Sequence, residues 1–242
     1  MYQYIRRRGA SRDNKDTRWG GWPEVQPGQS VQAILNTANR QGGDTIFLGP
    51  YTFYFRSTLT VPSYVTVRGV PNRTKLVILF DPDDPQYGPV VALNAYSRLQ
   101  DCIVDFDLTQ EGSITGYSFA QDTAAFTTPS GTSTLSSTDY NSVVRLDGSR
   151  ARVQDCRIPA GVRRAVVVTA NRGMMIGNEI SHDTTNASAA IYLNDDIEQC
   201  VISSNLCTST ATGAASDDGI ISIEDGTYNV VSGNLATLVE RT

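Results

Sequence analysis

The sequence predicts an all-β fold, a right-handed parallel β-helix in which short strands wind into a single solenoid. Its 242 residues are 40% apolar and only 19% charged, with 20 glycines and 10 prolines, a mixture typical of strands and turns. Short β-branched and aromatic runs follow one another closely along the chain. A motif that ends in cysteine or asparagine also recurs at intervals of mostly 22 to 29 residues. A chain of this length is sufficient for one core and needs no second domain.

Residues 1–28 precede the predicted solenoid and show neither helical nor strand periodicity. Residues 1–27 carry six Lys or Arg against three acids, although the whole chain has a net charge of −5. We expect an extended arm that docks the protein onto a partner, because arginine and tryptophan anchor many interfaces. The alternative is a disordered tail. The candidate contact residues of the arm are Arg6, Arg7, Arg8, Arg18, Trp19 and Trp22.

A capping helix is predicted over about residues 30–41, at the start of a β-helix that spans residues 29–242. Ser30 is placed to cap its amino terminus, and Gly42-Gly43 to end it. Its apolar stripe, at helical spacing, comprises Val31, Ile34, Leu35 and Ala38. From Asp44 onward the pattern changes to the strand-like runs TIFLG, YTFYF, STLTV, YVTVRGV and KLVILF.

The internal repeat has the form apolar-x-x-Cys/Asn, and a strand-like run precedes each copy. The copies end at Cys102, Cys156, Asn178, Asn205 and Asn234, with offsets of 54, 22, 27 and 29 residues. One unit is too small to bury its own apolar face, so we expect successive coils to stack with parallel strands about 4.8 Å apart. A turn asparagine tolerates left-handed backbone angles, and its amide can pair with the equivalent residue one coil away. The alternative fold, a β-sandwich, would need hairpin turns such as Asn-Gly, which the sequence lacks.

The first interval is twice the others because about residues 108–140 are inserted there. These residues contain 14 Ser or Thr, and we expect an ordered protrusion from one coil that contacts a neighbouring subunit. A second, smaller protrusion is expected over residues 207–217.

Several classes of site and location are excluded by composition. The four cysteines form no CxxC pair and the chain has one histidine, so we expect reduced, buried thiols and no metal site. The negative net charge argues against general nucleic-acid binding, and no cofactor is indicated. No apolar stretch approaches the roughly 20 residues of a membrane span, and residues 1–8 lack the apolar core of a signal peptide. We therefore expect assembly in a cytoplasm without membrane insertion.

The stretch SVQAILNTANRQGGDTIFLGPYTFYFRSTLTVPSYVTVRGV resembles the opening of pectate-lyase-like β-helix proteins. In that family an amphipathic helix caps the solenoid, and the first strands have the forms G-T-[IV]-x-[LF] and S-x-L-x-[IV]-P-x-x-V-x-[LV]-x-G. The match covers about 45 residues closely and the later coils loosely. Phage tailspikes share this opening and are trimers of parallel β-helices. The resemblance implies the fold, which hosts lyases, hydrolases and inert virion parts alike.

Acidic pairs are the candidates for a glycan site. Glycosidases place two carboxyl groups about 5 Å or about 6.5–9.5 Å apart. Stacked coils produce the shorter spacing automatically, so the spacing alone is weak evidence. We expect no catalytic residue, because acids on coil surfaces commonly cap turns. The alternative glycan site comprises Asp195, Asp196, Asp217 and Asp218, with Glu224-Asp225 as a further pair.

The motifs of sugar-cleaving relatives are only partly present. Their Asn-x-Asp and Asp-Asp elements resemble residues 194–196 and 217–218, whereas their Gly-His-Gly and Arg-x-Lys elements are missing. A lyase needs a basic residue as proton abstractor, and no Arg or Lys lies between Arg172 and Arg241.

The sequence therefore favours a non-enzymatic structural protein of a bacteriophage virion. We expect a tailspike-like homotrimer on the virion surface that decorates or cements the capsid, with the major capsid protein as its partner. The alternative is a short tailspike or tail-fibre protein that binds, or less readily cleaves, a host cell-surface polysaccharide. As an enzyme it would be a polysaccharide lyase or a glycoside hydrolase.

Overall fold

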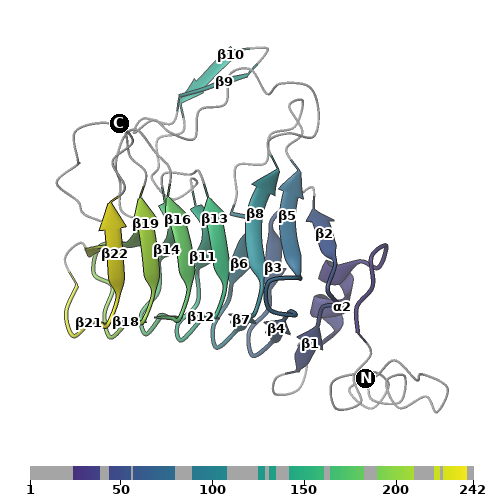
Figure 1. The fold of residues 1–242 in the computed structure, drawn as a ribbon, viewed down its shortest axis with the longest axis horizontal. Helices are drawn as coiled ribbons and strands as arrows, with labels where there is room; N and C mark the ends of the chain where they lie inside the picture. The colour runs from purple at the N-terminus through teal and green to yellow at the C-terminus, as the bar shows by residue number, and fades with distance from the viewer. Residues whose placement is uncertain are drawn as a thin grey trace.

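The structure is a computed structural model, and it confirms the predicted solenoid of short parallel strands (Figure 1). Three parallel sheets run the length of the molecule, and the chain visits them in the same order in each coil. The residues described are 24–38, 44–55, 57–79, 89–107, 125–128, 131–134, 142–160, 164–182, 190–209, 221–223 and 226–238.

Each sheet collects one strand from each successive coil. Sheet 1 contains β1 (Thr45–Phe47), β4 (Thr66–Arg68), β7 (Arg98–Gln100), β12 (Arg152–Gln154), β15 (Met174–Ile176), β18 (Val201–Ser203) and β21 (Val230–Ser232). Sheet 2 contains β2 (Thr52–Phe55), β5 (Lys75–Leu79), β8 (Ile103–Asp107), β13 (Arg157–Ala160), β16 (Glu179–His182), β19 (Leu206–Ser209) and β22 (Leu235–Leu238). Sheet 3 contains β3 (Leu59–Val61), β6 (Val91–Leu93), β11 (Ser142–Leu146), β14 (Arg164–Val168), β17 (Ile191–Leu193) and β20 (Ile221–Ile223).

The core is a set of apolar columns, one from each inward position of the sheets. In sheet 1 the middle residue of every three-residue strand points inward, and the strands pair in register. Each inward residue therefore lies about one strand spacing, roughly 4.8 Å, from its equivalents. The inward column of sheet 1 is Ile46, Val67, Leu99, Val153, Met175, Ile202 and Val231.

A row of asparagine amides closes the turn between sheets 1 and 2, as the repeat predicts. Asn178 donates through Nδ2 to Asn205 Oδ1 at 2.8 Å, and Asn205 donates in the same way to Asn234 Oδ1 at 2.9 Å. Each Oδ1 also accepts the backbone N–H of the ladder residue one coil earlier, beginning with Cys156 N–H to Asn178 Oδ1 at 3.0 Å. Cys102 precedes Cys156 in the same row, because Arg157 N–H donates to Cys102 O.

The amino-terminal end of the solenoid is covered by α2 (Val31–Ala38), the predicted capping helix. Ser30 caps it, since Ser30 Oγ accepts the N–H of Ala33 at 3.2 Å. Val31, Leu35 and Ala38 are buried. The predicted helix extends beyond residue 38, and residues 39–41 lie outside the described ranges.

The last residues assigned to the arm belong to the fold. Val25 forms a parallel bridge with Leu48 and is only 4% exposed. Its backbone N–H donates to Phe47 O at 2.9 Å. The predicted arm of residues 1–28 thus includes Val25, which packs on the first coil, whereas residues 1–23 lie outside the described ranges.

The longest segments between strands all follow a strand of sheet 2 and precede a strand of sheet 3. Residues 80–90, 108–141, 183–190 and 210–220 all join these two sheets. The insertion predicted at 108–140 contains an antiparallel hairpin of β9 (Ala125–Thr128) and β10 (Gly131–Thr134). Its other residues, and most of the smaller predicted protrusion at 207–217, lie outside the described ranges.

All four cysteines are buried and reduced, as predicted. Burial raises the pKa of the Cys156 thiol to about 12 and that of Cys207 to about 11. Burial also raises the pKa of Cys102, and electrostatic interactions with Cys156 and Asp101 raise it further. The thiols therefore stay protonated near neutral pH and act as small apolar fillers of the core.

Loss of one ladder amide should destabilise the solenoid strongly. We expect Asn178→Ala to lower the free energy of unfolding by about 3 kcal/mol, because buried groups on two neighbouring coils lose their partners. Asn171→Ala is the matched control, since Asn171 makes an exposed bond to the N–H of Glu198 at 3.0 Å. It should cost less than about 1 kcal/mol. Urea denaturation followed by circular dichroism measures both, and equal costs would contradict a structural role for the ladder.

Candidate functional site

The last described coil exposes an inward residue of a kind that the earlier coils bury. Val231 occupies the same inward column as Ile202, yet Val231 is 46% exposed and Ile202 is 1% exposed. Elsewhere in that column the exposure does not exceed 6%. The inward column of sheet 1 is therefore exposed to solvent at its last described residue.

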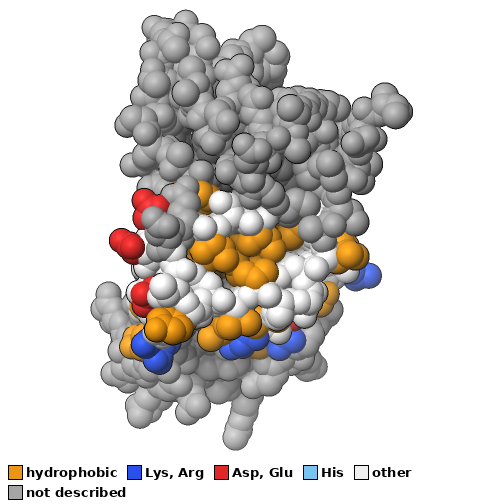
Figure 2. All heavy atoms as spheres, turned by 90° about the vertical axis from the view of Figure 1, so that its left-hand side faces the viewer, with side chains coloured by type: hydrophobic (Ala, Val, Ile, Leu, Met, Phe, Trp, Pro, Cys, Tyr) orange, Lys and Arg blue, Asp and Glu red, His pale blue; other side chains and the backbone are white. Residues whose placement is uncertain are grey.

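Further apolar side chains surround Val231 and form one surface, which we call the end face. It consists of Ile223, Tyr228, Val230, Val231 and Leu235, whose exposed fractions run from 38% to 80%. Figure 2 views the molecule from this end and shows apolar side chains gathered at its centre, with acidic side chains on one side and basic ones below. Soluble proteins seldom expose a contiguous apolar surface of this kind unless it binds something.

The backbone of the end face is also unpaired along one side. In the described part of the chain, no strand lies beyond β20, β21 or β22 in its sheet. Each of these strands thus presents a row of N–H and C=O groups that could extend the sheet with another chain. The end face combines an apolar interior with three open parallel edges.

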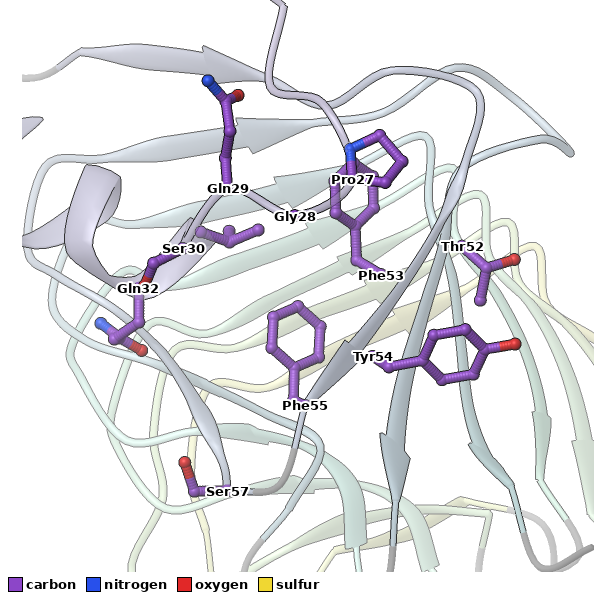
Figure 3. A pocket seen from close by; sticks show the side chains of 11 residues that line it. Pro27, Gly28, Gln29, Ser30, Gln32, Thr52, Phe53, Tyr54, Phe55 and Ser57 are labelled. Atoms are coloured by element: carbon purple, nitrogen blue, oxygen red, sulfur yellow. The ribbon is translucent and has the colours of Figure 1, made fainter. Parts of the chain in front are cut away.

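The opposite end differs because α2 and the Val25 bridge cover it. A pocket of about 500 Å³ lies there, between the segment that leads into α2 and β2. Phe53 and Phe55 lie on one side of β2 and Tyr54 on the other (Figure 3). Apart from the Tyr54 hydroxyl, none of the described lining residues has a titratable side chain. These described residues offer apolar and amide contacts but no acid–base pair.

The acids of the alternative glycan site are placed only in part. Asp195 and Asp196 are exposed on the turn after β17, and Asp196 has a left-handed backbone with φ of 61°. They follow the carboxyl end of a sheet 3 strand. Asp217 and Asp218 lie outside the described residues, in the connection that enters the amino end of β20. The structure therefore places only Asp195 and Asp196, and the four-residue site stays a prediction.

A second group of acids, which the sequence interpretation overlooked, lines a shallow pocket of about 180 Å³ at the turn between sheets 1 and 2. The sequence pattern that could have indicated this group is the tetrapeptide Leu/Val-Gln-Asp-Cys, which occurs at residues 99–102 and 153–156. Asp101 accepts from Arg68 Nε at 2.9 Å, and Asp155 accepts from Gln154 Nε2 at 2.8 Å. A third acid, Glu179, pairs with Arg157 at 3.2 Å. Each carboxylate thus has a local partner and stabilises the turn.

Other predicted features have a more limited place in the structure. The arm residues Arg6, Arg7, Arg8, Arg18, Trp19 and Trp22 lie outside the described residues. Within the described ranges, no three His, Cys, Asp or Glu side chains are arranged to hold a metal ion. No helix of these ranges has the length and apolar character that a membrane crossing requires.

Known structures share this architecture, but their sequences are distant. The chain matches a provisionally assigned glycosyl hydrolase from Parabacteroides merdae with a TM-score of 0.56 and 10% identity, over 85% of this chain and 86% of that one. It matches a pectin methylesterase from Yersinia enterocolitica with a TM-score of 0.52 and 16% identity, over 80% of this chain and 59% of that one. No protein family and no curated protein matches the sequence. These similarities establish a right-handed parallel β-helix of the pectate-lyase-like type and no activity.

The acidic turn pocket should respond to mutation as a structural feature. Gly177 has φ of +69°, and a Cβ there would lie 2.6 Å from Asp155 Oδ1, so Gly177→Ala should lower the free energy of unfolding by about 2 kcal/mol. Gly233→Ala is the matched control, with φ of +62° and no atom closer than 3.8 Å, and should cost about 1 kcal/mol.

Adding Asp155→Ala should recover the difference between the two glycine variants. Urea denaturation of the single and double variants measures this coupling. Costs that simply add would show that the Asp155 carboxylate does not fill the space above Gly177.

Proposed function

We propose that this protein is a non-catalytic structural subunit that joins a larger assembly by docking its end face onto another protein. The observation that carries the proposal is the exposure of Val231, an inward core residue that is 46% exposed. A solenoid with an open terminal coil has an apolar interior and free strand edges in contact with water. A docked protein would cover both at once.

Burial of the end face would supply a useful binding free energy. Each apolar side chain that passes from exposed to buried contributes about 1.5–3 kcal/mol, of which a half-exposed side chain gains only part. The five residues of the end face together could thus offset much of the entropy lost on association. Strand edges add directionality, because a partner must present hydrogen-bonding groups in register.

The assembly that we propose is a bacteriophage virion, with the chain present as a homotrimer on the particle surface. The support is the resemblance of the first 45 residues of the solenoid to the opening of phage tailspikes. A rigid solenoid and a basic, tryptophan-containing arm suit a protein that decorates or cements a capsid. The major capsid protein is then the proposed partner, and assembly takes place in the host cytoplasm.

A carbohydrate-binding or carbohydrate-cleaving protein is the second candidate. It is favoured by the names of the two structural neighbours, a provisional glycosyl hydrolase and a pectin methylesterase. The described carboxylates of the turn pocket are engaged by Arg68, Gln154 and Arg157, which leaves them poorly suited to proton transfer.

A charged residue in the end face should prevent docking without unfolding the chain. We expect Leu235→Glu, at a side chain that is 60% exposed, to reduce incorporation into particles at least about 30-fold, as loss of an interface hot spot does. Val231→Asp provides an independent second variant. Incorporation is measured as copies per purified particle by quantitative immunoblotting, and sedimentation confirms that each variant keeps its oligomeric state.

Tyr51→Glu is the control, because Tyr51 is 38% exposed at the opposite end of the solenoid. It should load normally. A deletion of residues 1–23, which keeps Val25 in place, separates the arm from the end face. Normal incorporation of both end-face variants would eliminate the end face as the docking site, whatever the arm deletion does.

The second candidate makes a different prediction about the acids. If the chain cleaves polysaccharide, Asp195→Ala or Asp217→Ala should reduce turnover at least about 100-fold. Under the structural proposal the wild-type protein releases no reducing ends or unsaturated sugars from capsular glycans. Assays of both products on purified glycans test this, and turnover that is lost in the variants would replace the structural proposal.

A further inference from the structure

Two arginines lie directly opposite each other on neighbouring coils of sheet 1. Arg98 begins β7 and Arg152 begins β12, and the two residues are register partners in the parallel pairing of these strands. Both side chains point outward and are half-buried. Like charges at directly opposed positions of a sheet are destabilising, since their spacing is about 4.8 Å.

These two arginines differ from the Lys and Arg side chains that form ion pairs elsewhere in the fold. The ion pairs among the described residues join Arg68 to Asp101, Lys75 to Asp105, Arg145 to Asp147 and Arg157 to Glu179. Within the same described ranges, no carboxylate lies within ion-pair distance of Arg98 or Arg152. In the described part of the chain, neither arginine therefore has a direct ion-pair partner.

The Arg152 guanidinium also has an unsatisfied donor. Its Nε is buried and has no hydrogen-bond acceptor in the described structure. Burial lowers the pKa of Arg152, the charge of Arg98 lowers it further, and Asp155 opposes the shift. A buried donor without a partner costs free energy in the unliganded protein, which an added acceptor would recover.

The surroundings extend the positive charge along one edge of the molecule. Arg150 and Arg172 are exposed on successive turns that lead into sheet 1. The Arg150 guanidinium lies over the Tyr96 ring at 5.2 Å, and Tyr96 stacks on Tyr64 with ring centroids 4.9 Å apart. These contacts hold the Arg150 side chain over the Tyr96 ring, on the turn that precedes Arg152. The Tyr96 ring thus contacts both a second aromatic ring and a guanidinium group.

We propose that Arg98 and Arg152 form a binding site for an oxyanion, a carboxylate or a sulfate that bridges the two guanidinium groups. Arginine presents several donors in a fixed plane and matches such groups with paired hydrogen bonds. Half-burial strengthens these bonds relative to those of fully exposed arginines. The site lies on the side of the solenoid, on the third and fourth strands of sheet 1, and does not depend on docking at the end face.

Titration with inorganic sulfate tests the site directly. Sodium sulfate should raise the melting temperature of the wild-type protein saturably, beyond the effect of sodium chloride at equal ionic strength. Arg98→Gln and Arg152→Gln should each weaken the apparent sulfate affinity about tenfold or more, because each removes a charge-assisted hydrogen bond. Arg73→Gln, an exposed arginine on another turn, is the charge-matched control and should leave the affinity unchanged.

Four further measurements separate the explanations. Sodium acetate in the same assay shows whether the site takes a carboxylate, and a sulfated polysaccharide shows whether the oxyanion binds more tightly when carried on a polymer. Without any oxyanion, Arg152→Met should be as stable as the wild type, since it removes an unsatisfied charge. Equal responses to sulfate and chloride, or a sulfate response unchanged in both Gln variants, would overturn the proposal. Leu235→Glu should bind sulfate normally, so failure of the end-face proposal remains distinguishable.

Discussion

Hydrogen bonding between successive coils in parallel register is the constraint on which the rest of the structure depends. Each coil must follow the path of the coil before it. Otherwise the backbone hydrogen bonds between coils are lost in all three sheets at once. The asparagine row from Asn178 to Asn234 enforces this path, because each amide bonds both the backbone and the amide of its neighbours. Side chains then fall into columns, and the apolar columns become the core.

The same constraint makes the two ends of the molecule unequal. A coil within the stack has neighbours on both sides, whereas the last described coil has a neighbour on one side only. At the amino-terminal end, α2 supplies Val31, Leu35 and Ala38 in place of a further coil. At the other end the inward Val231 has no such cover. The end face is therefore a direct consequence of solenoid geometry, and assembly is one way to resolve it.

The fold was largely predictable from the sequence because periodicity reports the backbone path. The recurring Cys and Asn positions identified the ladder, yet its member Thr74 was missed. The turn between β4 and β5, residues 69–74, is longer than its equivalents, so Thr74 does not follow an apolar residue at the spacing of the repeat. Its place in the ladder is shown by the Ile103 N–H, which donates to Thr74 O at 2.9 Å. The acidic turn was overlooked for another reason: Asp101 and Asp155 adjoin ladder residues, but the partner of Asp101 comes from a strand distant in sequence. Solvent exposure at Val231 could not be predicted from the sequence, since it depends on how completely the rest of the chain covers that coil in space.

Columns also explain how residues far apart in sequence become a binding site. Arg98 and Arg152 are separated by the whole 108–141 insertion, yet each directly precedes a copy of the Leu/Val-Gln-Asp-Cys tetrapeptide. The two copies mark equivalent positions, and parallel register places the two arginines on adjacent strands. Arg98 and Arg152 belong to one outward column of sheet 1, in which Thr66 precedes Arg98 and Met174 follows Arg152. Within this column the positive charge is therefore confined to two coils. A solenoid can thus carry a charged pair without altering its core, because outward positions change independently of inward ones. The cost of the pair is then electrostatic rather than one of packing, and a bound oxyanion would offset a cost of that kind.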